Sequence, residues 1–121
     1  MKKQVLVSII SKQTIPNYLF IKDRQEQDDE MLFIATQEMK NEADWLIQTL
    51  KCTEEEKQVI LLEKNQEEKW NEMTAAIAEH ISSDKHYVVN LTGGTKYMTL
   101  AVYHLFSKYD SEFFYIPFPR N

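Results

Sequence analysis

The sequence predicts an α/β fold, a three-layer α/β/α sandwich around a mostly parallel sheet of about five to six strands. Two observations predict it. Short apolar runs alternate along the chain with segments whose apolar residues recur at helical spacing, and strands that alternate with helices form parallel sheets through right-handed crossovers. The length of 121 residues fits a single domain, so residues 1–121 are treated as one folding unit.

Five apolar runs are typical of buried strands. The first is nearly continuous in apolar residues, as a strand covered on both faces should be. Pro117 and Pro119 are expected to end the last run, because proline cannot donate to a sheet ladder. The five runs are residues 4–10, 31–35, 58–62, 87–91 and 113–116.

Helices are expected between these runs. Thr14 can cap the first, with Pro16 in its first turn. Asn65 precedes Glu68 by three residues and is expected to cap the third. Trp45 lies among the apolar residues of the second helix and is expected in the core. The residues expected on the inward faces are Leu19 and Phe20; Met39, Ala43, Leu46, Ile47 and Leu50; Trp70, Met73, Ile77 and Ile81; and Met98, Ala101, Val102 and Leu105.

Composition excludes several classes of protein. Hydrophobic residues make up 43% and charged residues 27%, the profile of a soluble globular protein. No apolar run approaches the roughly 20 residues of a membrane span, and residues 5–10 are too few for a signal-peptide core. The single Cys52 excludes an internal disulfide and agrees with a reducing cytoplasm. A formal net charge of -5 disfavours non-specific DNA or RNA binding, although a local set of donors can still hold an anion.

Both glycines of the chain stand together, at Gly93 and Gly94, where average usage of about 7% would give roughly eight in all. That place therefore needs unusual backbone angles or the close approach of a ligand. Thr92 and Thr95 add hydroxyl donors, and Lys96 adds a positive charge at the start of a helix, whose N-terminus attracts phosphate. The plainer alternative is that the glycines only make a tight strand-to-helix turn. The spacing is neither that of a Walker A loop nor Gly-x-Gly-x-x-Gly.

Three loops are expected at the carboxyl ends of the first, second and fourth strands, where open parallel sheets bind ligands. If the first strand is central and the fourth lies beside it, the first and last loops flank one crevice. Ser11, Gln13 and Thr14 in the first loop suit hydrogen bonds to a ribose or a base, although Thr14 is equally well explained as a helix cap. Thr36 follows the second strand, where capping is its favoured role, and Asn90 opens the last loop.

Other reactive residues carry weaker signals. His80, His86 and His104 are scattered without metal-ligand spacing, so no metal site is predicted. Cys52 has no histidine placed to activate it as a nucleophile.

The last loop resembles the signature of CARF domains, the CRISPR-associated Rossmann-fold sensors. It reads Asn90-Leu91-Thr92-Gly93-Gly94-Thr95-Lys96. The first strand and loop are similar to those of the group joined to a restriction-type nuclease or an adenosine deaminase, including Gln13 before the pair Pro16-Asn17. The resemblance covers essentially the whole chain.

The resemblance implies a Rossmann-like domain that forms a homodimer and binds cyclic oligoadenylate, most often cyclic tetra-adenylate, across the two-fold axis. In the family, type III CRISPR complexes make this messenger when they detect viral RNA, and its binding activates an attached effector. No effector follows in this sequence, so either an excised sensor or a complete small protein is expected. We expect no cofactor, no membrane contact and no direct DNA binding by this domain. The residues that the resemblance places at the ligand are Ser11, Gln13, Thr14, Thr36, Asn90, Thr92, Gly93, Gly94, Thr95 and Lys96.

Two classes of function stay open. The first is a sensor that binds without catalysis. The second is a ring nuclease, in which a ribose 2′-hydroxyl attacks its own phosphate while Ser11, Thr95 and Lys96 hold the geometry and stabilise the developing charge. No histidine stands near either loop in the sequence to act as a general base, which favours the sensor. A response-regulator-like domain is disfavoured because the strand ends lack an acidic cluster.

Overall fold

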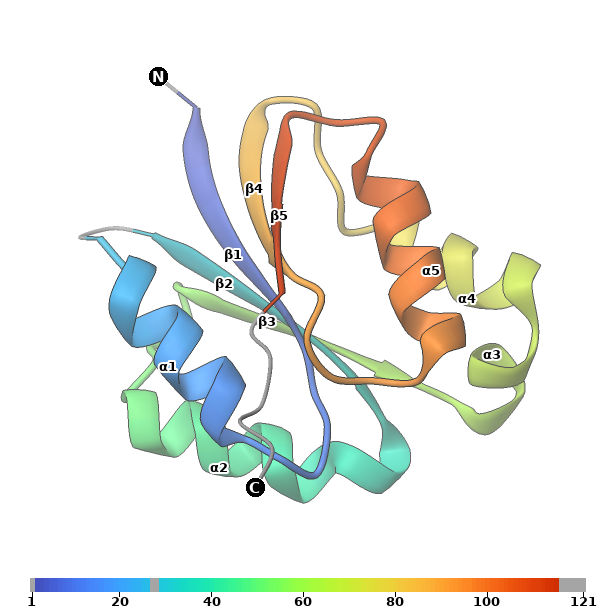
Figure 1. Ribbon diagram of the computed structural model, residues 1–121, viewed down its shortest axis with the longest axis horizontal. Helices are drawn as coiled ribbons and strands as arrows, with labels where there is room; N and C mark the ends of the chain where they lie inside the picture. Colours follow the sequence, from blue (N-terminus) through green and yellow to red (C-terminus); the bar gives the residue numbers. More distant parts are fainter. Residues whose placement is uncertain (1, 27–28, 116–121) are drawn as a thin grey trace.

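The computed structural model describes residues 2–26 and 29–115, which fold around one five-stranded sheet (Figure 1). The strands are β1 (Lys3–Ile9), β2 (Glu30–Thr36), β3 (Lys57–Leu62), β4 (Lys85–Asn90) and β5 (Ser111–Phe114). The helices are α1 (Ile15–Arg24), the 3-10 helix η1 (Gln37–Met39), α2 (Lys40–Leu50), α3 (Lys64–Glu68), α4 (Trp70–Ala78) and α5 (Lys96–Phe106). Every strand pair is parallel, so the predicted α/β class is confirmed.

The strand order is β3-β2-β1-β4-β5, with β1 in the centre. Ser8 of β1 pairs with Phe33 of β2 on one side and with Asn90 of β4 on the other. The chain winds outward from β1 to β3 and then returns to the far side of β1, as in Rossmann folds. The carboxyl ends of β1 and β4 therefore lie side by side, which meets the condition under which the two loops that follow them were expected to flank one crevice.

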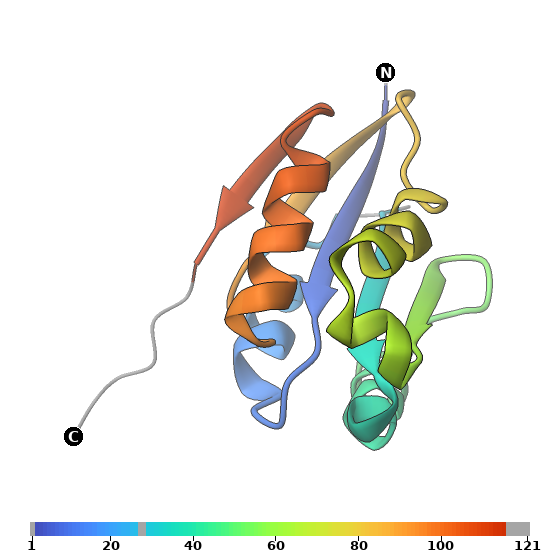
Figure 2. The same ribbon diagram turned by 90° about the vertical axis from the view of Figure 1, so that its right-hand side faces the viewer.

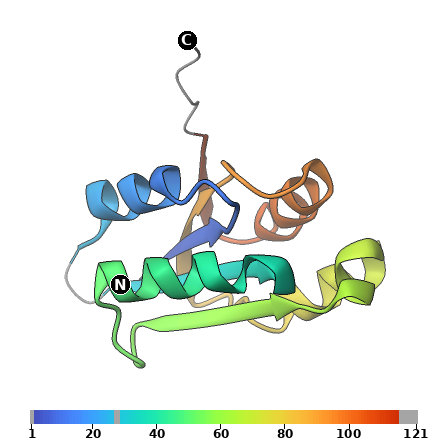
Figure 3. The same cartoon turned by 90° about the horizontal axis from the view of Figure 1, so that it is seen from below.

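Helices cover both faces of the sheet. Figure 2 shows α3, α4 and α5 in front of the strands, and Figure 3 shows α1 and α5 on opposite sides of β1 and β4. Because side chains alternate along a strand, neighbouring residues of β1 enter different clusters. Leu6 packs with Phe20 of α1, whereas Val7 packs with Met73 of α4 and Val102 of α5. Two apolar clusters on the two faces of the sheet confirm the three-layer sandwich.

Two of the residues predicted for the core are on the surface. Leu19 is 53% exposed and Trp45 is 44% exposed, so both predictions are wrong. Each stands next to a buried residue of its helix, Phe20 and Leu46 respectively, and therefore falls outside the inward stripe. The Trp45 ring lies on the outer surface of the helix layer, 6.5 Å from the ring of Tyr18. The predicted residues that are buried are Phe20, Ala43, Leu46, Leu50, Met73, Ile77, Met98, Ala101, Val102 and Leu105.

The predicted third helix is two helices, broken at Lys69, whose φ of -120° and ψ of 120° are extended. The capping pair is also different from the prediction. Glu63 and Gln66 form a reciprocal capping box at the start of α3, instead of Asn65 and Glu68. The break changes the direction of the chain. As a result α4, and not α3, places buried side chains against the sheet.

The outer strands differ in detail from the predicted runs. The third run was expected to be buried, but β3 is an edge strand in which only Ile60 and Leu62 are buried. β5 begins two residues earlier than predicted, and Ile116, Pro117 and Pro119 lie outside the described residues. Within the described part of the chain, no helix combines the length and apolar character needed to cross a lipid bilayer.

Candidate functional site

Three loops meet at the carboxyl edge of the sheet, which is the lower edge in Figure 1. They are residues 10–14 after β1, η1 after β2, and residues 91–95 after β4. The strand order reverses between β1 and β4, and open α/β sheets bind ligands at such a switch point. The first and last loops are in close contact, since a Cβ built on Gly93 would lie 3.2 Å from the Ser11 Oγ.

The two glycines press the last loop onto the end of β1. Gly93 has a φ of +99° and Gly94 a φ of +74°, a left-handed backbone that residues with side chains avoid. A Cβ on Gly93 would lie 2.9 Å from the carbonyl oxygen of Ile9, and one on Gly94 would overlap the Ile9 Cγ2. The glycines thus do make a tight turn. Gly94 nevertheless remains exposed, so a ligand can reach the outer side of this turn.

Two buried asparagines fasten the last loop to the first helix. Asn90 Nδ2 donates to Asn17 Oδ1 at 3.1 Å, and Asn17 Nδ2 donates to the carbonyl oxygen of Ile9 at 3.0 Å. The Oδ1 of Asn90 accepts the N–H of Thr92 at 2.9 Å. Asn17 is 1% exposed and Asn90 is 0% exposed, and satisfied polar networks of this kind make a buried region rigid. The side chain of Asn90, predicted to touch a ligand, therefore lies beneath the loop and fixes its shape.

The loop ends at the N-terminus of α5. Thr95 is the N-cap, and its Oγ1 accepts the N–H of Met98 at 3.2 Å. Thr99 Oγ1 donates to the carbonyl oxygen of Thr95 at 3.0 Å and lies 3.3 Å from that of Gly93. The other N–H groups of the first turn have no acceptor within the helix. Together with the helix dipole and the exposed side chain of Lys96, they favour a bound anion here.

A cavity of about 180 Å³, which we call the loop cavity, lies between the three loops. Four of the predicted residues contribute to it: Ser11, Thr36, Gly94 and Thr95. Its other residues are apolar or charged, and none of them was predicted to contact a ligand. They are Ile10, Met39 and Met98, and Lys12, Glu38 and Glu67.

A wider hollow of about 580 Å³, the α5 hollow, lies against the outer side of α5. It is lined by Leu91, Gly93, Gly94, Lys96, Thr99, Leu100 and Tyr115. Gly94 lines both the loop cavity and the α5 hollow, so the glycine turn is the wall between them. A ligand that lies across this turn would reach Lys96 on one side and Thr95 on the other.

Two predicted residues of the first loop line neither space. Gln13 is exposed, and its carbonyl oxygen accepts from Ser11 Oγ at 3.2 Å. Thr14 is the N-cap residue of α1, and Thr36 is that of η1, but neither side chain makes a capping hydrogen bond. Both residues therefore stand at N-cap positions, as the capping explanation predicts, but their hydroxyl groups form no capping hydrogen bond.

Sequence reasoning missed Asn17 and Glu67. A signal for Asn17 exists, because it falls three residues before Phe20, on the buried stripe of α1, where an unpaired amide would be costly. Glu67 stands in a Glu-x-Lys pattern with Lys69, which is more simply explained as solvated surface, and its approach to the loops depends on how α3 packs after β3.

The other reactive side chains do not assemble a second site. The Cys52 Sγ lies 3.5 Å from the Met31 Sδ, and burial raises the pKa of its thiol, which weakens it as a nucleophile. His104 lies on the exposed side of α5, its ring 5.8 Å from that of Trp70. Within residues 2–26 and 29–115, no three His, Cys, Asp or Glu side chains are grouped so as to hold a metal ion.

Comparison with known families identifies the family of this chain. The family model described as the Card1 CARF domain matches residues 5–121. The chain belongs to this family. Among solved structures, it is similar to Can2 from Sulfobacillus thermosulfidooxidans in complex with cyclic tetra-adenylate, with a TM-score of 0.67 at 20% identity. The match covers 94% of this CARF domain and 32% of the Can2 chain, so the domain spans about a third of that relative. At such low identity the likeness concerns the fold, and it confirms the Rossmann-like architecture. No curated protein matches the chain by sequence.

Proposed function

We propose that this CARF domain binds a cyclic oligoadenylate, with cyclic tetra-adenylate as the preferred ring, and serves as the sensor of a type III CRISPR antiviral effector in the cytoplasm. One observation carries the proposal. The Gly93-Gly94 turn is held against the end of β1 at the strand-order reversal, with the exposed Lys96 beside it. The structural relative Can2 was solved with cyclic tetra-adenylate, which makes the same class of ligand the first to test.

The charge of the ligand fits the local chemistry of the turn. The chain carries a net charge of -5, so it has no general attraction for phosphates. The first turn of α5 supplies N–H donors and the positive end of the helix dipole, and Lys96 supplies a mobile cation. Among the described residues, the Lys96 ammonium forms no ion pair within the chain, so it is available to a phosphate.

We further propose that two copies of the domain form a symmetric dimer through the outer face of α5. Leu100 is 60% exposed, Tyr103 50% and Tyr115 69%. Exposed apolar side chains gathered in this way mark interaction surfaces. Leu100 and Tyr115 line the α5 hollow together with Lys96, so a second copy on this face would bring two glycine turns and two lysines to one two-fold axis.

Cleavage of the ring is the second candidate. Ser11 and Thr95 line the loop cavity and Lys96 lines the α5 hollow, so these three residues flank the proposed ligand. No histidine is among the residues that line either space, which supports binding without efficient proton transfer. Incubation with radiolabelled cyclic tetra-adenylate separates the two candidates, because linear products appear only if the domain is a ring nuclease.

The binding proposal is tested by calorimetry and thermal shift with cyclic tri-, tetra- and hexa-adenylate. We expect cyclic tetra-adenylate to raise the melting temperature most, because a ligand of the native state stabilises it. Lys96→Ala should weaken binding by about 1–3 kcal/mol, the range for losing a charged hydrogen bond. Lys108→Ala, which removes an exposed lysine beyond the other end of α5, should leave affinity unchanged. A protein that binds none of the three rings would overturn the proposal.

The dimer is tested separately by light scattering coupled to size-exclusion chromatography. Leu100→Glu places a charge in the proposed interface and should shift the protein from dimer to monomer. Glu79→Gln, at the C-cap of α4 and outside the proposed interface, should not change the molar mass measured in solution. A wild-type domain that is monomeric with and without the ring would exclude the symmetric arrangement.

A further inference from the structure

We infer that the loop cavity is a slot for one base of the bound ring, and that Glu67 makes the slot specific for adenine by accepting a hydrogen bond from its exocyclic amino group. This inference rests on the proposed function, because it concerns the same ligand. It goes further, since it names a residue that reads the base on an element, α3, that is remote from the glycine turn in the sequence.

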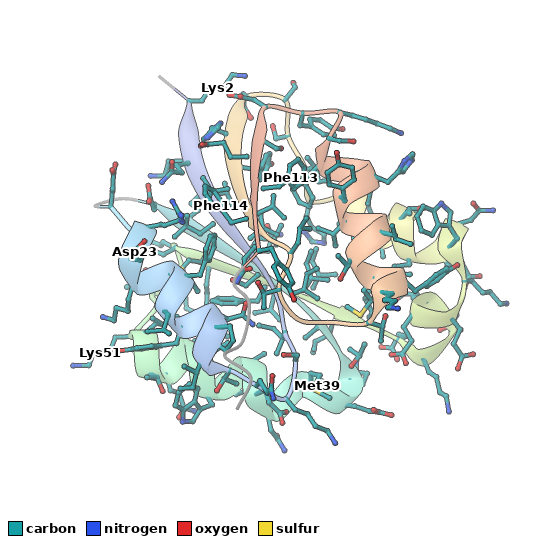
Figure 4. The ribbon with its side chains drawn as sticks, in the orientation of Figure 1. Lys2, Asp23, Met39, Lys51, Phe113 and Phe114 are labelled. Atoms are coloured by element: carbon teal, nitrogen blue, oxygen red, sulfur yellow. The ribbon has the colours of Figure 1, made fainter. Side chains whose placement is uncertain are left out.

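The volume and lining of the cavity suit one heterocyclic base. The volume of about 180 Å³ is below the roughly 300 Å³ at which pockets for drug-sized ligands begin, so it takes one part of the ring and not the whole. Ile10, Met39 and Met98 supply its apolar wall, and Ile10 and Met98 are 1% and 2% exposed. Methionine sulfur makes favourable contacts with aromatic rings. Met39, labelled in Figure 4, lies at the foot of the sheet and lines the cavity.

The charges around the cavity define which part of the ligand enters. Glu67 is half-buried and Glu38 is exposed at the rim, and neither carboxylate has an ion-pair partner in the part of the chain that the structure describes. A carboxylate only accepts hydrogen bonds and repels phosphate. The phosphates are therefore kept away from the two glutamates. The exposed cations left to attract them are Lys96 with the first turn of α5, on the other side of Gly94, and Lys12 in the first loop. What faces the glutamates must be a donor.

At position 6 of the purine ring adenine carries a donor, whereas guanine and hypoxanthine carry an acceptor there and have their donors elsewhere, at N1 and, in guanine, N2. The exocyclic nitrogen N6 of adenine carries two hydrogens, and the acceptor of the other two purines is O6. Opposite a half-buried carboxylate, an O6 would leave two acceptors facing each other. Glu67 is firmly placed, because the preceding Glu63–Gln66 capping box fixes the start of α3, and Gln37 Nε2 of the η1 loop donates to Glu63 Oε1 at 3.3 Å. This hydrogen bond links the start of α3 to η1, the two elements that carry Glu67 and Met39.

The test compares two probes, cyclic tetra-adenylate and cyclic tetra-inosinate, by calorimetry. The wild-type domain should prefer the adenylate ring by at least about tenfold, the discrimination that one well-formed base contact provides. Glu67→Gln keeps the shape of the side chain and adds an amide donor that can reach O6. The preference should fall by at least about tenfold or reverse in this variant. Because each variant is scored by its own ratio between the rings, a small change in its stability does not affect the result.

Glu68→Gln is the matched control, since Glu68 is the exposed neighbour of Glu67 and does not line the cavity. It should keep the wild-type ratio. Equal binding of the two rings by the wild type, or an unchanged ratio in Glu67→Gln, would overturn the base slot and leave the sensor proposal standing. A wild type that binds neither ring would overturn the proposed function itself.

Discussion

The two edges of the sheet differ in whether their charged side chains form ion pairs. At the amino edge, Lys85 Nζ lies 2.8 Å from Glu30 Oε1, and His86 lies between Glu112 at 2.8 Å and Asp110 at 3.2 Å. At the carboxyl edge, among the described residues, Lys12 and Lys96 take part in no ion pair and are exposed. Figure 4 shows the separation, with Lys2 labelled near the amino edge and Met39 near the carboxyl edge.

This difference in ion pairing explains why a hollow with lysines in its lining is not by itself a binding site for an anion. A hollow of about 200 Å³ at the amino edge includes Glu30, Lys57 and Lys85 in its lining. Its lysines already meet carboxylates, since Lys57 Nζ also lies 3.0 Å from Glu54 Oε1. The hydrogen bond that the Lys85 ammonium donates to the Glu30 carboxylate raises the pKa of Lys85. At the carboxyl edge, Lys12 and Lys96 have no ion pair among the described residues, and the loops are held by backbone shape and buried amides. We therefore expect substitutions at the amino edge to act through lost ion pairs. Substitutions at the carboxyl edge should act through a disturbed backbone and lost amide hydrogen bonds.

The largest effect is expected where backbone shape is decisive. Gly94→Val puts a branched side chain on a left-handed backbone and into the Ile9 Cγ2. The left-handed conformation costs about 1–2 kcal/mol and the overlap about 1–3 kcal/mol, so the free energy of unfolding should fall by about 2–5 kcal/mol. Urea denaturation measures it.

Binding of cyclic tetra-adenylate is measured on the same variant under conditions where it remains folded. If the turn serves the ligand, affinity should fall beyond the loss expected from the smaller folded fraction. A loss below about 1 kcal/mol in stability would contradict the close contact between the glycine turn and β1.

The buried asparagines come next. Asn90→Ala removes the acceptor of the Thr92 N–H and the partner of Asn17, and leaves buried polar atoms unsatisfied. The free energy of unfolding should fall by about 1–3 kcal/mol. Asn17→Ala should cost a similar amount, and the double variant less than the sum, because both residues belong to one network. Strict additivity of the two losses in urea titrations would show that no such network exists.

The fate of the individual predictions shows which features a sequence can encode locally. Apolar runs and the carboxyl-edge rule were enough for the parallel sheet and for the position of the glycine turn after β4, whereas the central place of β1 had only been assumed. The surface positions of Leu19 and Trp45 were not foreseen, because an apolar side chain beside a core residue looks like a core residue until the helix is docked. Asn90 was expected at the ligand, and the structure places its side chain under the loop, because its partner Asn17 is supplied by a helix far away in the chain. The place of Glu67 beside the loop cavity was not foreseen either, because it depends on how α3 packs after β3.

At the amino edge, a pH-dependent effect is expected from His86. Glu112 and Asp110 raise the pKa of its imidazole above the ordinary value of about 6.5, because both favour the charged ring. A raised folded-state pKa stabilises the protein fully below the unfolded value, and the contribution is lost as the pH rises through the folded value. His86→Gln should therefore be less stable than wild type by about 0.2–1 kcal/mol near pH 6, and by less as the pH rises.

The measurement is a pair of urea titrations, at about pH 6 and about pH 9, bracketing the change in charge of the imidazole. The same contact lowers the pKa of the Asp110 carboxyl, so its own contribution persists until the pH falls well into the acid range. His104→Gln is the control, because the ring of His104 meets that of Trp70 and no carboxylate among the described residues. A difference between His86→Gln and wild type that grows with pH would refute the ion-pair assignment.

The smallest effect is expected at Ser8, which tests where the polar network of the carboxyl edge stops. Ser8 is 0% exposed and pairs in register with Asn90, yet its Oγ has no hydrogen-bond partner among the described residues. A buried hydroxyl without a partner opposes folding, so Ser8→Ala should leave the free energy of unfolding unchanged or raise it by up to about 1 kcal/mol. A loss above about 1 kcal/mol in urea titrations would mean that the hydroxyl belongs to the Asn17–Asn90 network. The buried polar network of the carboxyl edge would then extend one residue further into β1, beyond the Ile9 carbonyl that already belongs to it.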